Sequence, residues 1–167
     1  MKNYRLLLTL AACCLLTACE KWPAINHSLG LTWTKCASTK AADTKGTTEK
    51  TPTMLILEHT DFGLAVTLTD AEMNCAIDID GLVEHLNIEG NVITYVLEQS
   101  NRANCICRIS QITSTIPGLI EGNEYILKYY YGPAVKPIKF RYQVGFKKRI
   151  DVDKNLEDPI SGNYGEE

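Results

Sequence analysis

The stretch GLAVTLTD, residues 63–70, alternates between large apolar side chains and small or polar ones. In a β-strand, Leu64, Val66 and Leu68 would face one side and the residues between them the other. The run 73–78 repeats this period of two. Such a pattern is typical of strands that bury one face and expose the other, so it predicts a β-sheet protein.

Similar short runs fill most of the remaining chain and are separated by turn residues. We expect further strands at residues 29–34, 54–58, 82–89, 92–98, 104–114, 124–131 and 137–146. The pair Gly90-Asn91 lies between two of these runs, and both residue types tolerate the positive φ of a tight hairpin turn. No stretch after residue 28 shows a helical period with caps. About seven to nine short strands predict an all-β fold, an antiparallel sandwich or a barrel.

One segment favours the sandwich over the barrel. Residues 116–125 read IPGLIEGNEY, with Leu119, a glycine three residues on at Gly122 and a tyrosine at Tyr125. This spacing resembles the tyrosine corner between strands E and F of fibronectin type III and related immunoglobulin-like domains, although Glu121 stands where that family usually has proline. The resemblance covers about residues 114–131. It implies an immunoglobulin-like or fibronectin III-like β-sandwich, in which the Tyr125 hydroxyl bonds to the backbone upstream.

The N-terminus has the pattern of a secretory signal peptide. Residues 1–20 read MKNYRLLLTLAACCLLTACE, so that Lys2 and Arg5 precede an apolar run at residues 6–16. The run is well short of the roughly 20 residues that a membrane-spanning helix needs. We therefore expect residues 1–18 to be a signal peptide that is removed from the mature chain.

The end of this signal resembles the lipobox of bacterial lipoproteins, at Leu16-Thr17-Ala18-Cys19. The resemblance implies cleavage between Ala18 and Cys19, a diacylglycerol on the Cys19 thiol and an acyl chain such as palmitate on the new amine. Two or three chains make a stable membrane anchor, and no other cofactor is expected. Glu20 is not the aspartate that commonly retains lipoproteins at the inner membrane. The start Cys-Glu-Lys is also compatible with Bacteroidetes surface lipoproteins.

These features divide the chain into four parts. We expect a signal peptide at 1–18, a lipidated tether at 19–28, a β-sandwich domain at 29–149 and an acidic disordered tail at 150–167. Within the domain, residues 37–53 contain seven Ser or Thr and no large apolar residue, so they predict a flexible exposed loop. The localisation that follows is the cell envelope, lipid-anchored at the outer membrane, on its periplasmic face or at the cell surface.

The cysteines sort by position. Of seven, Cys13 and Cys14 leave with the signal and Cys19 carries lipid. An oxidising compartment then favours disulfides among the other four, which are Cys36, Cys75, Cys105 and Cys107.

The last two of these lie two apart on a predicted strand, about 6.5–7 Å between their Cα atoms, at the limit of disulfide reach. We expect each to pair elsewhere, one with Cys75 and the other with Cys36. Buried free thiols are the main alternative. A zinc site or a redox centre is less favoured, because paired C-x-x-C spacing is missing.

No motif in the chain predicts catalysis or metal binding. Asp78 and Asp80 before Gly81 resemble part of a calcium loop, but the EF-hand pattern would place Ala76 and Asn87 at its ligand positions. The three histidines have no ligand spacing. His59 and Asp61 lie close in sequence, yet a catalytic dyad also needs a nucleophile and an orienting group. We therefore expect no enzyme activity.

The whole chain has 17 basic and 20 acidic residues, which disfavours nucleic acid as a partner. The leading hypothesis is a lipid-anchored, non-enzymatic envelope lipoprotein that acts as a binding or accessory module with an envelope partner. The alternative is a surface glycan-binding lipoprotein of a carbohydrate uptake system, which predicts an aromatic patch near Tyr130 or Trp33. A third is an envelope enzyme or thiol chaperone, which predicts a cleft joining a histidine to a carboxylate or free thiol. Lys139 and Arg141, in a run of basic residues at 136–149, are candidates for glycan or lipid-phosphate contact.

Overall fold

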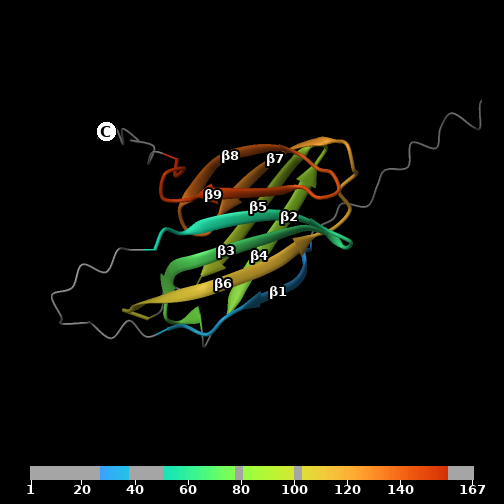
Figure 1. The fold of residues 1–167 in the computed structure, drawn as a ribbon. Coiled ribbons are helices and arrows are strands. Elements are labelled where there is room, and N and C mark those ends of the chain that lie inside the picture. Colours follow the sequence, from blue (N-terminus) through green and yellow to red (C-terminus); the bar gives the residue numbers. More distant parts are fainter. Residues whose placement is uncertain (1–26, 38–50, 78–80, 100–102, 158–167) are drawn as a thin grey trace, which may run out of the picture.

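The computed structural model describes residues 27–37, 51–77, 81–99 and 103–157, which form two β-sheets packed face to face (Figure 1). The strands are β1 (Leu29–Trp33), β2 (Met54–Thr60), β3 (Gly63–Asn74), β4 (Leu82–Glu89), β5 (Val92–Gln99), β6 (Ile106–Ile116), β7 (Glu124–Tyr130), β8 (Ala134–Arg141) and β9 (Lys147–Asp151). In the part of the chain that the structure describes, no helix is long and apolar enough to cross a membrane. The predicted all-β sandwich is confirmed.

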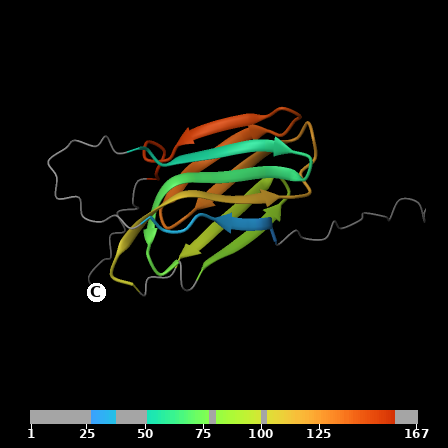
Figure 2. The ribbon, with the colours of Figure 1, turned by 60° about the horizontal axis from the view of Figure 1, so that its bottom comes forward.

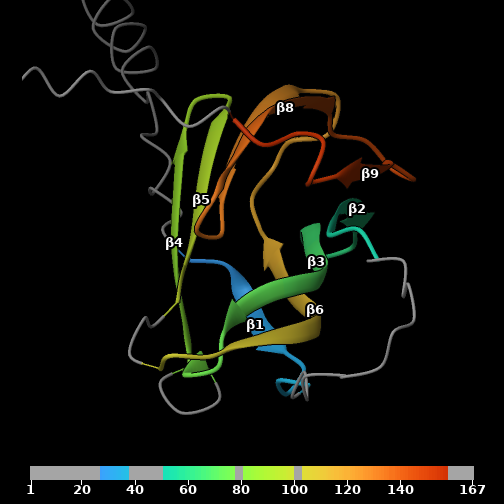
Figure 3. The ribbon, with the colours of Figure 1, turned by 90° about the vertical axis from the view of Figure 1, so that its left-hand side faces the viewer.

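The two sheets have five and four strands. The larger has the order β1-β6-β3-β2-β9 and the smaller the order β4-β5-β7-β8. Figures 2 and 3 show them as separate layers that cross at an angle. Six pairings are antiparallel, but β5 and β7 run parallel. This parallel pair was not expected. Between β5 and β7 the chain runs back along β6, which belongs to the opposite sheet, so β7 has the same direction as β5.

The inner faces of both sheets form one apolar core. Leu64, Val66 and Leu68 are all buried, as their alternation predicts. On the neighbouring strands β5 and β7 of the smaller sheet, the rings of Tyr95 and Tyr129 stack, with centroids 5.5 Å apart and planes 4° from parallel. Complete burial holds the pKa of the Tyr129 phenol well above its ordinary value. The core is therefore lined by both aliphatic and aromatic side chains.

An irregularity at Asp70 joins two runs that the sequence predicts as separate strands. Asp70 has a φ of 55°, but the pairs Thr69↔Gln111 and Ala71↔Ile109 on either side of it keep one register, so neither strand carries an extra residue. The buried face changes phase on both strands at this level, from Leu68 to Ala71 on β3 and from Ile109 to Ile112 on β6. The predicted strands 63–70 and 73–78 are thus one strand, β3, that ends at Asn74.

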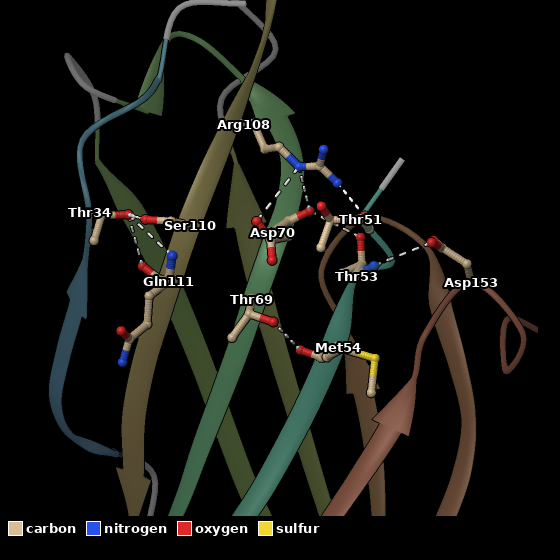
Figure 4. Close-up of polar contacts among 10 residues, drawn as sticks. All are labelled: Thr34, Thr51, Thr53, Met54, Thr69, Asp70, Arg108, Ser110, Gln111 and Asp153. Carbon is tan, nitrogen blue, oxygen red and sulfur yellow. Dashed lines mark hydrogen bonds and ion pairs between the residues drawn. The ribbon is translucent and has the colours of Figure 1, made fainter. Parts of the chain in front are cut away.

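Asp70 and Arg108 hold both ends of the predicted loop 37–53 (Figure 4). The Asp70 carbonyl accepts hydrogen bonds from Arg108 Nε at 3.3 Å and from Thr53 Oγ1 at 3.2 Å. The Arg108 guanidinium also donates to the Thr51 carbonyl, and Ala37 forms a bridge with Arg108. The loop prediction is wrong at its edges, because these polar groups find partners on β3 and β6. Residues 38–50 lie outside the described residues.

The C-terminal boundary also differs from the prediction. The expected strand 137–146 is interrupted after Arg141, and the chain turns at residues 142–146 before β9 pairs with β2. Ile150 and Val152 are buried, and Leu156 packs on the core. The acidic tail predicted at 150–167 therefore begins with core residues, because its overall charge conceals three apolar side chains. Residues 158–167 lie outside the described residues.

Candidate functional site

Four connections and the start of β1 gather at one end of the sandwich, on the right-hand side of Figure 1. The connections are residues 61–62, 90–91, 117–123 and 142–146. We call this the loop end, and the opposite end, which holds both disulfides, the disulfide end. Loops on a rigid sandwich are the usual place for binding residues.

The connection 117–123 is held rigidly to the sandwich. The Tyr125 hydroxyl accepts a hydrogen bond from Ile120 N at 2.9 Å, and its ring stacks on Phe140. Gly122 has a φ of 86° and donates its N–H to the Tyr142 carbonyl at 2.7 Å. Leu119 packs against the core from its partly buried position. The kinship with fibronectin type III domains stays a prediction, since this geometry requires no common ancestry.

An open depression of about 500 Å³ lies at the loop end between three of the connections. His59, near the end of β2, stacks on Tyr142 with centroids 5.1 Å apart. Its Nε2 lies 3.4 Å from Glu121 Oε1. The rest of the lining comes from Thr60, Asp61, Phe62, Gly118, Leu119 and Val144.

The depression offers hydrogen-bonding groups but no activated nucleophile among its described residues. Burial, and next the negative charge of Glu121, raise the pKa of the Tyr142 phenol, so this group stays a proton donor at neutral pH. The Thr60 hydroxyl donates to the Gly63 carbonyl at 2.8 Å and so serves the tight turn. The arrangement suits binding of a polar group better than covalent chemistry.

Sequence reasoning missed the contact between His59 and Glu121. The two residues are far apart in the chain, and no fixed spacing links them; only the topology brings the end of β2 to the connection 117–123. Asp61, which does lie close to His59 in sequence, also lines the depression.

Four of the seven exposed large apolar side chains among the described residues lie at the same end, and the other three are Trp33, Val83 and Ile106. Phe62 is 76% exposed, Val144 70% and Ile120 54%, each in a different connection. Leu29, the first residue of β1, is 50% exposed. Burial of such side chains against another apolar surface is favourable, so the loop end is a candidate contact surface.

A polar network fixes the point where the N-terminal segment joins the domain. Ser28 Oγ lies 2.6 Å from both carboxylate oxygens of Glu84, and Ser28 N donates to the same carboxylate at 3.2 Å. The Tyr95 hydroxyl lies 2.7 Å from Glu84 Oε2 and 2.8 Å from Ser114 Oγ. One phenol carries one proton, so it donates to the carboxylate and accepts from the serine.

The four cysteines beyond the predicted signal and lipid site are paired as Cys36–Cys107 and Cys75–Cys105. The Cα atoms of each pair are 5.6 Å apart, within the normal range for a disulfide. The expectation that the two close cysteines find separate partners is confirmed. Cys75 lies in the turn after β3 rather than on a strand.

A second surface surrounds Tyr130. Tyr129 and Tyr131 are buried, whereas the ring of Tyr130 lies half-buried on the outer face of β7, beside Val96 of β5. An open depression of about 570 Å³ lies there, lined also by Leu97, Glu98, Gln99 and Gly132. Trp33, the other aromatic residue named from the sequence, belongs to the opposite sheet and lies beside Gly81.

Several predicted residues lie outside the described ranges. These are the lipobox residues Leu16, Thr17, Ala18 and Cys19, and the carboxylates Asp78 and Asp80. The described residues contain no group of three or more His, Cys, Asp or Glu side chains placed to hold a metal ion.

Comparison with known proteins finds no family model that matches the chain, no curated protein of significant sequence similarity and no solved structure of significant structural similarity. A function for this chain therefore rests on its own residues and their geometry.

Proposed function

We propose that this protein is a lipid-anchored lipoprotein of the bacterial cell envelope, in which a non-enzymatic β-sandwich acts as a binding or accessory module. Cys19 carries the lipid after removal of residues 1–18, and residues 19–28 connect it to the domain. The outer membrane is the proposed location. The partner is an envelope component that meets the sandwich surface.

The observation that carries this proposal is the pairing of all four remaining cysteines in two disulfides. Disulfides of this kind form and persist in oxidising compartments, beyond the inner membrane in bacteria. The signal-like and lipobox-like N-terminus gives an independent reason to expect export. Both features support a location beyond the inner membrane.

The anchor is tested with the variant Cys19→Ala, compared with Cys14→Ala. Both changes remove a thiol from the same short segment, but only the first removes the proposed lipid acceptor. We expect Cys19→Ala to abolish labelling by radioactive palmitate and to release the protein from membrane pellets. Cys14→Ala should behave as the parent. Sedimentation of Cys19→Ala with membranes, or labelling that persists, would contradict the anchor.

The loop-end depression is the feature that bears on the enzyme hypothesis, because His59 there contacts the carboxylate of Glu121. We favour binding over catalysis since the Thr60 hydroxyl is committed to Gly63 and Tyr142 holds its proton. All four cysteines described are oxidised, which leaves no reactive thiol among them for a thiol chaperone.

Glycan binding is the second candidate function, and the depression beside Tyr130 favours it. A half-exposed aromatic ring beside Glu98 and Gln99 offers a stacking face together with hydrogen-bonding groups. Calorimetric titration with a panel of soluble polysaccharides tests this role. Binding that Tyr130→Ala abolishes and Trp33→Ala leaves intact would support it. The absence of heat with every polysaccharide would remove it.

A further inference from the structure

We propose that the loop end of the sandwich rests on the bilayer that holds the lipid anchor, with Phe62, Ile120 and Val144 in the interface of a zwitterionic phospholipid membrane. The inference rests on the proposed function, because lipid on Cys19 supplies the attachment. It adds an orientation, in which the disulfide end points away from the membrane.

The first argument is the kind of surface at this end. Three connections that are distant in sequence each present one strongly exposed apolar side chain, at 76%, 54% and 70% exposure. Phe, Ile and Val side chains on a rigid frame are suited to the boundary between headgroups and acyl chains, which accepts apolar groups to a depth of about 5–10 Å. The disulfide bonds lie at the opposite end, where β3 ends and β6 begins.

The second argument is where the N-terminal segment enters the domain. Leu29 pairs with Thr115, one residue before the end of β6 at Ile116, so β1 starts at the loop end. The bonds between Ser28 and Glu84 fix this entry point on the sandwich. An anchor attached there holds the loop end nearer to the membrane than the disulfide end.

The length of the connecting segment strengthens this argument. Residues 19–28 are ten residues, which span at most about 35 Å in any conformation. A domain confined to that distance meets the bilayer as an intramolecular partner. Weak apolar contacts that could not recruit a free protein then suffice to orient an attached one.

The charges around the apolar side chains fit a headgroup layer that carries both signs. Lys139 and Arg141 are exposed on β8 beside the loop end, and Arg141 Nε donates to the Gly122 carbonyl at 3.0 Å. Asp61 and Glu121 are exposed at the same end. Phosphate and ammonium groups of a zwitterionic phospholipid complement this mixture, whereas a purely anionic surface would repel half of it.

The test measures the depth of one introduced tryptophan at a time in the lipidated protein. Phe62→Trp and, separately, Val144→Trp report on the loop end. Ile106→Trp is the matched control, because Ile106 is 67% exposed but lies at the disulfide end. All variants carry Trp22→Phe and retain Trp33 as a common background. Each is reconstituted in phosphatidylcholine and phosphatidylethanolamine vesicles, with and without a nitroxide-labelled lipid.

We expect the nitroxide to quench the loop-end tryptophans at least about twofold more strongly than Trp at position 106, because interfacial side chains lie at headgroup depth. Equal quenching at the two ends, with lipid on Cys19 verified by mass, would overturn the orientation and leave the anchor standing. A chain that carries no lipid on Cys19 would overturn both proposals.

Discussion

The network around Tyr95 gives the sharpest stability prediction, tested by the variant Tyr95→Phe. The change keeps the ring that stacks on Tyr129 and removes only the hydroxyl. That hydroxyl contacts Glu84 at 2.7 Å and Ser114 at 2.8 Å. Its loss therefore isolates the polar contribution from the apolar packing.

The expected magnitude follows from the two contacts. A hydrogen bond to a charged group contributes about 1.5–3 kcal/mol, and a buried hydroxyl left without its partner costs about 1–3 kcal/mol. Glu84 is partly exposed and keeps its contacts with Ser28, and this reduces the first figure. Ser114 is buried and loses the partner described for it. We expect Tyr95→Phe to lower the free energy of unfolding by about 2–3 kcal/mol.

Urea unfolding in the Cys19→Ala background, which we expect to be soluble, measures this effect. With a slope of about 1.5–2 kcal/mol per molar urea, the midpoint should fall by about 1–2 M. A double-mutant cycle with Ser114→Ala should give a coupling of about 1 kcal/mol, because the second change removes the group that the first leaves unpaired.

The control is Tyr130→Phe, which makes the same chemical change on the outer face of the sheet. It should change stability by no more than about 0.5 kcal/mol. If the loss of stability in Tyr95→Phe falls in that same range, or if the cycle with Ser114→Ala is additive, the network does not stabilise the fold. The argument that the Ser28–Glu84 contact fixes where the N-terminal segment joins the domain would then also be weaker.

Three further predictions concern the core, the disulfides and the loop end. Burial raises the pKa of Tyr95 and of Tyr129 above 10.0, so the stability that each neutral phenol contributes is complete below pH 10 and is lost as the pH rises through the folded-state pKa. Urea midpoints should therefore fall from about pH 10 upward, and they should fall less steeply in Tyr95→Phe. Replacing both cysteines of Cys36–Cys107 by alanine should lower the free energy of unfolding by about 4 kcal/mol, and replacing those of Cys75–Cys105 by about 3.5 kcal/mol, because the closed segments span 71 and 30 residues. Thermal unfolding measures both losses. A larger loss from opening the shorter segment would contradict the entropic account. A Cβ at Gly63 would overlap the Ile116 carbonyl, so Gly63→Ala should lower the free energy of unfolding by about 2–4 kcal/mol, as measured with urea. Gly90 has open space around it and only its positive φ opposes a side chain, so the control Gly90→Ala should cost about 1 kcal/mol. Equal costs would mean that backbone movement relieves the contact at Gly63.

Local periodicity predicts the strands well where one face is buried without interruption. Leu64, Val66 and Leu68 face the core as their alternation requires. The pattern fails at Asp70, where the buried face changes phase although the register with β6 is unbroken, because such an irregularity and a turn leave the same break in an alternating sequence. The tail fails for a different reason, since an average over acidic residues hides Ile150 and Val152.

Nonlocal relations could not be read from the chain. The parallel pairing of β5 with β7 depends on where β6 crosses, and no residue in either strand encodes that choice locally. The same holds for His59 and Glu121, which meet because the end of β2 and the connection 117–123 lie at the same end of the sandwich. That Cys105 and Cys107 pair with different cysteines could be predicted, because strand geometry disfavours their pairing with each other. Which of them pairs with Cys36 and which with Cys75 depends on the topology and could not.

The position of β9 has a consequence for how this chain assembles. Among the described strands β9 pairs with β2 alone, so in a chain delivered from its N-terminus the edge of Met54–Thr60 stays open until residues 147–151 follow. An open strand edge is a template for pairing with other copies. We therefore expect nascent chains, and chains truncated before Lys147, to be the aggregation-prone species.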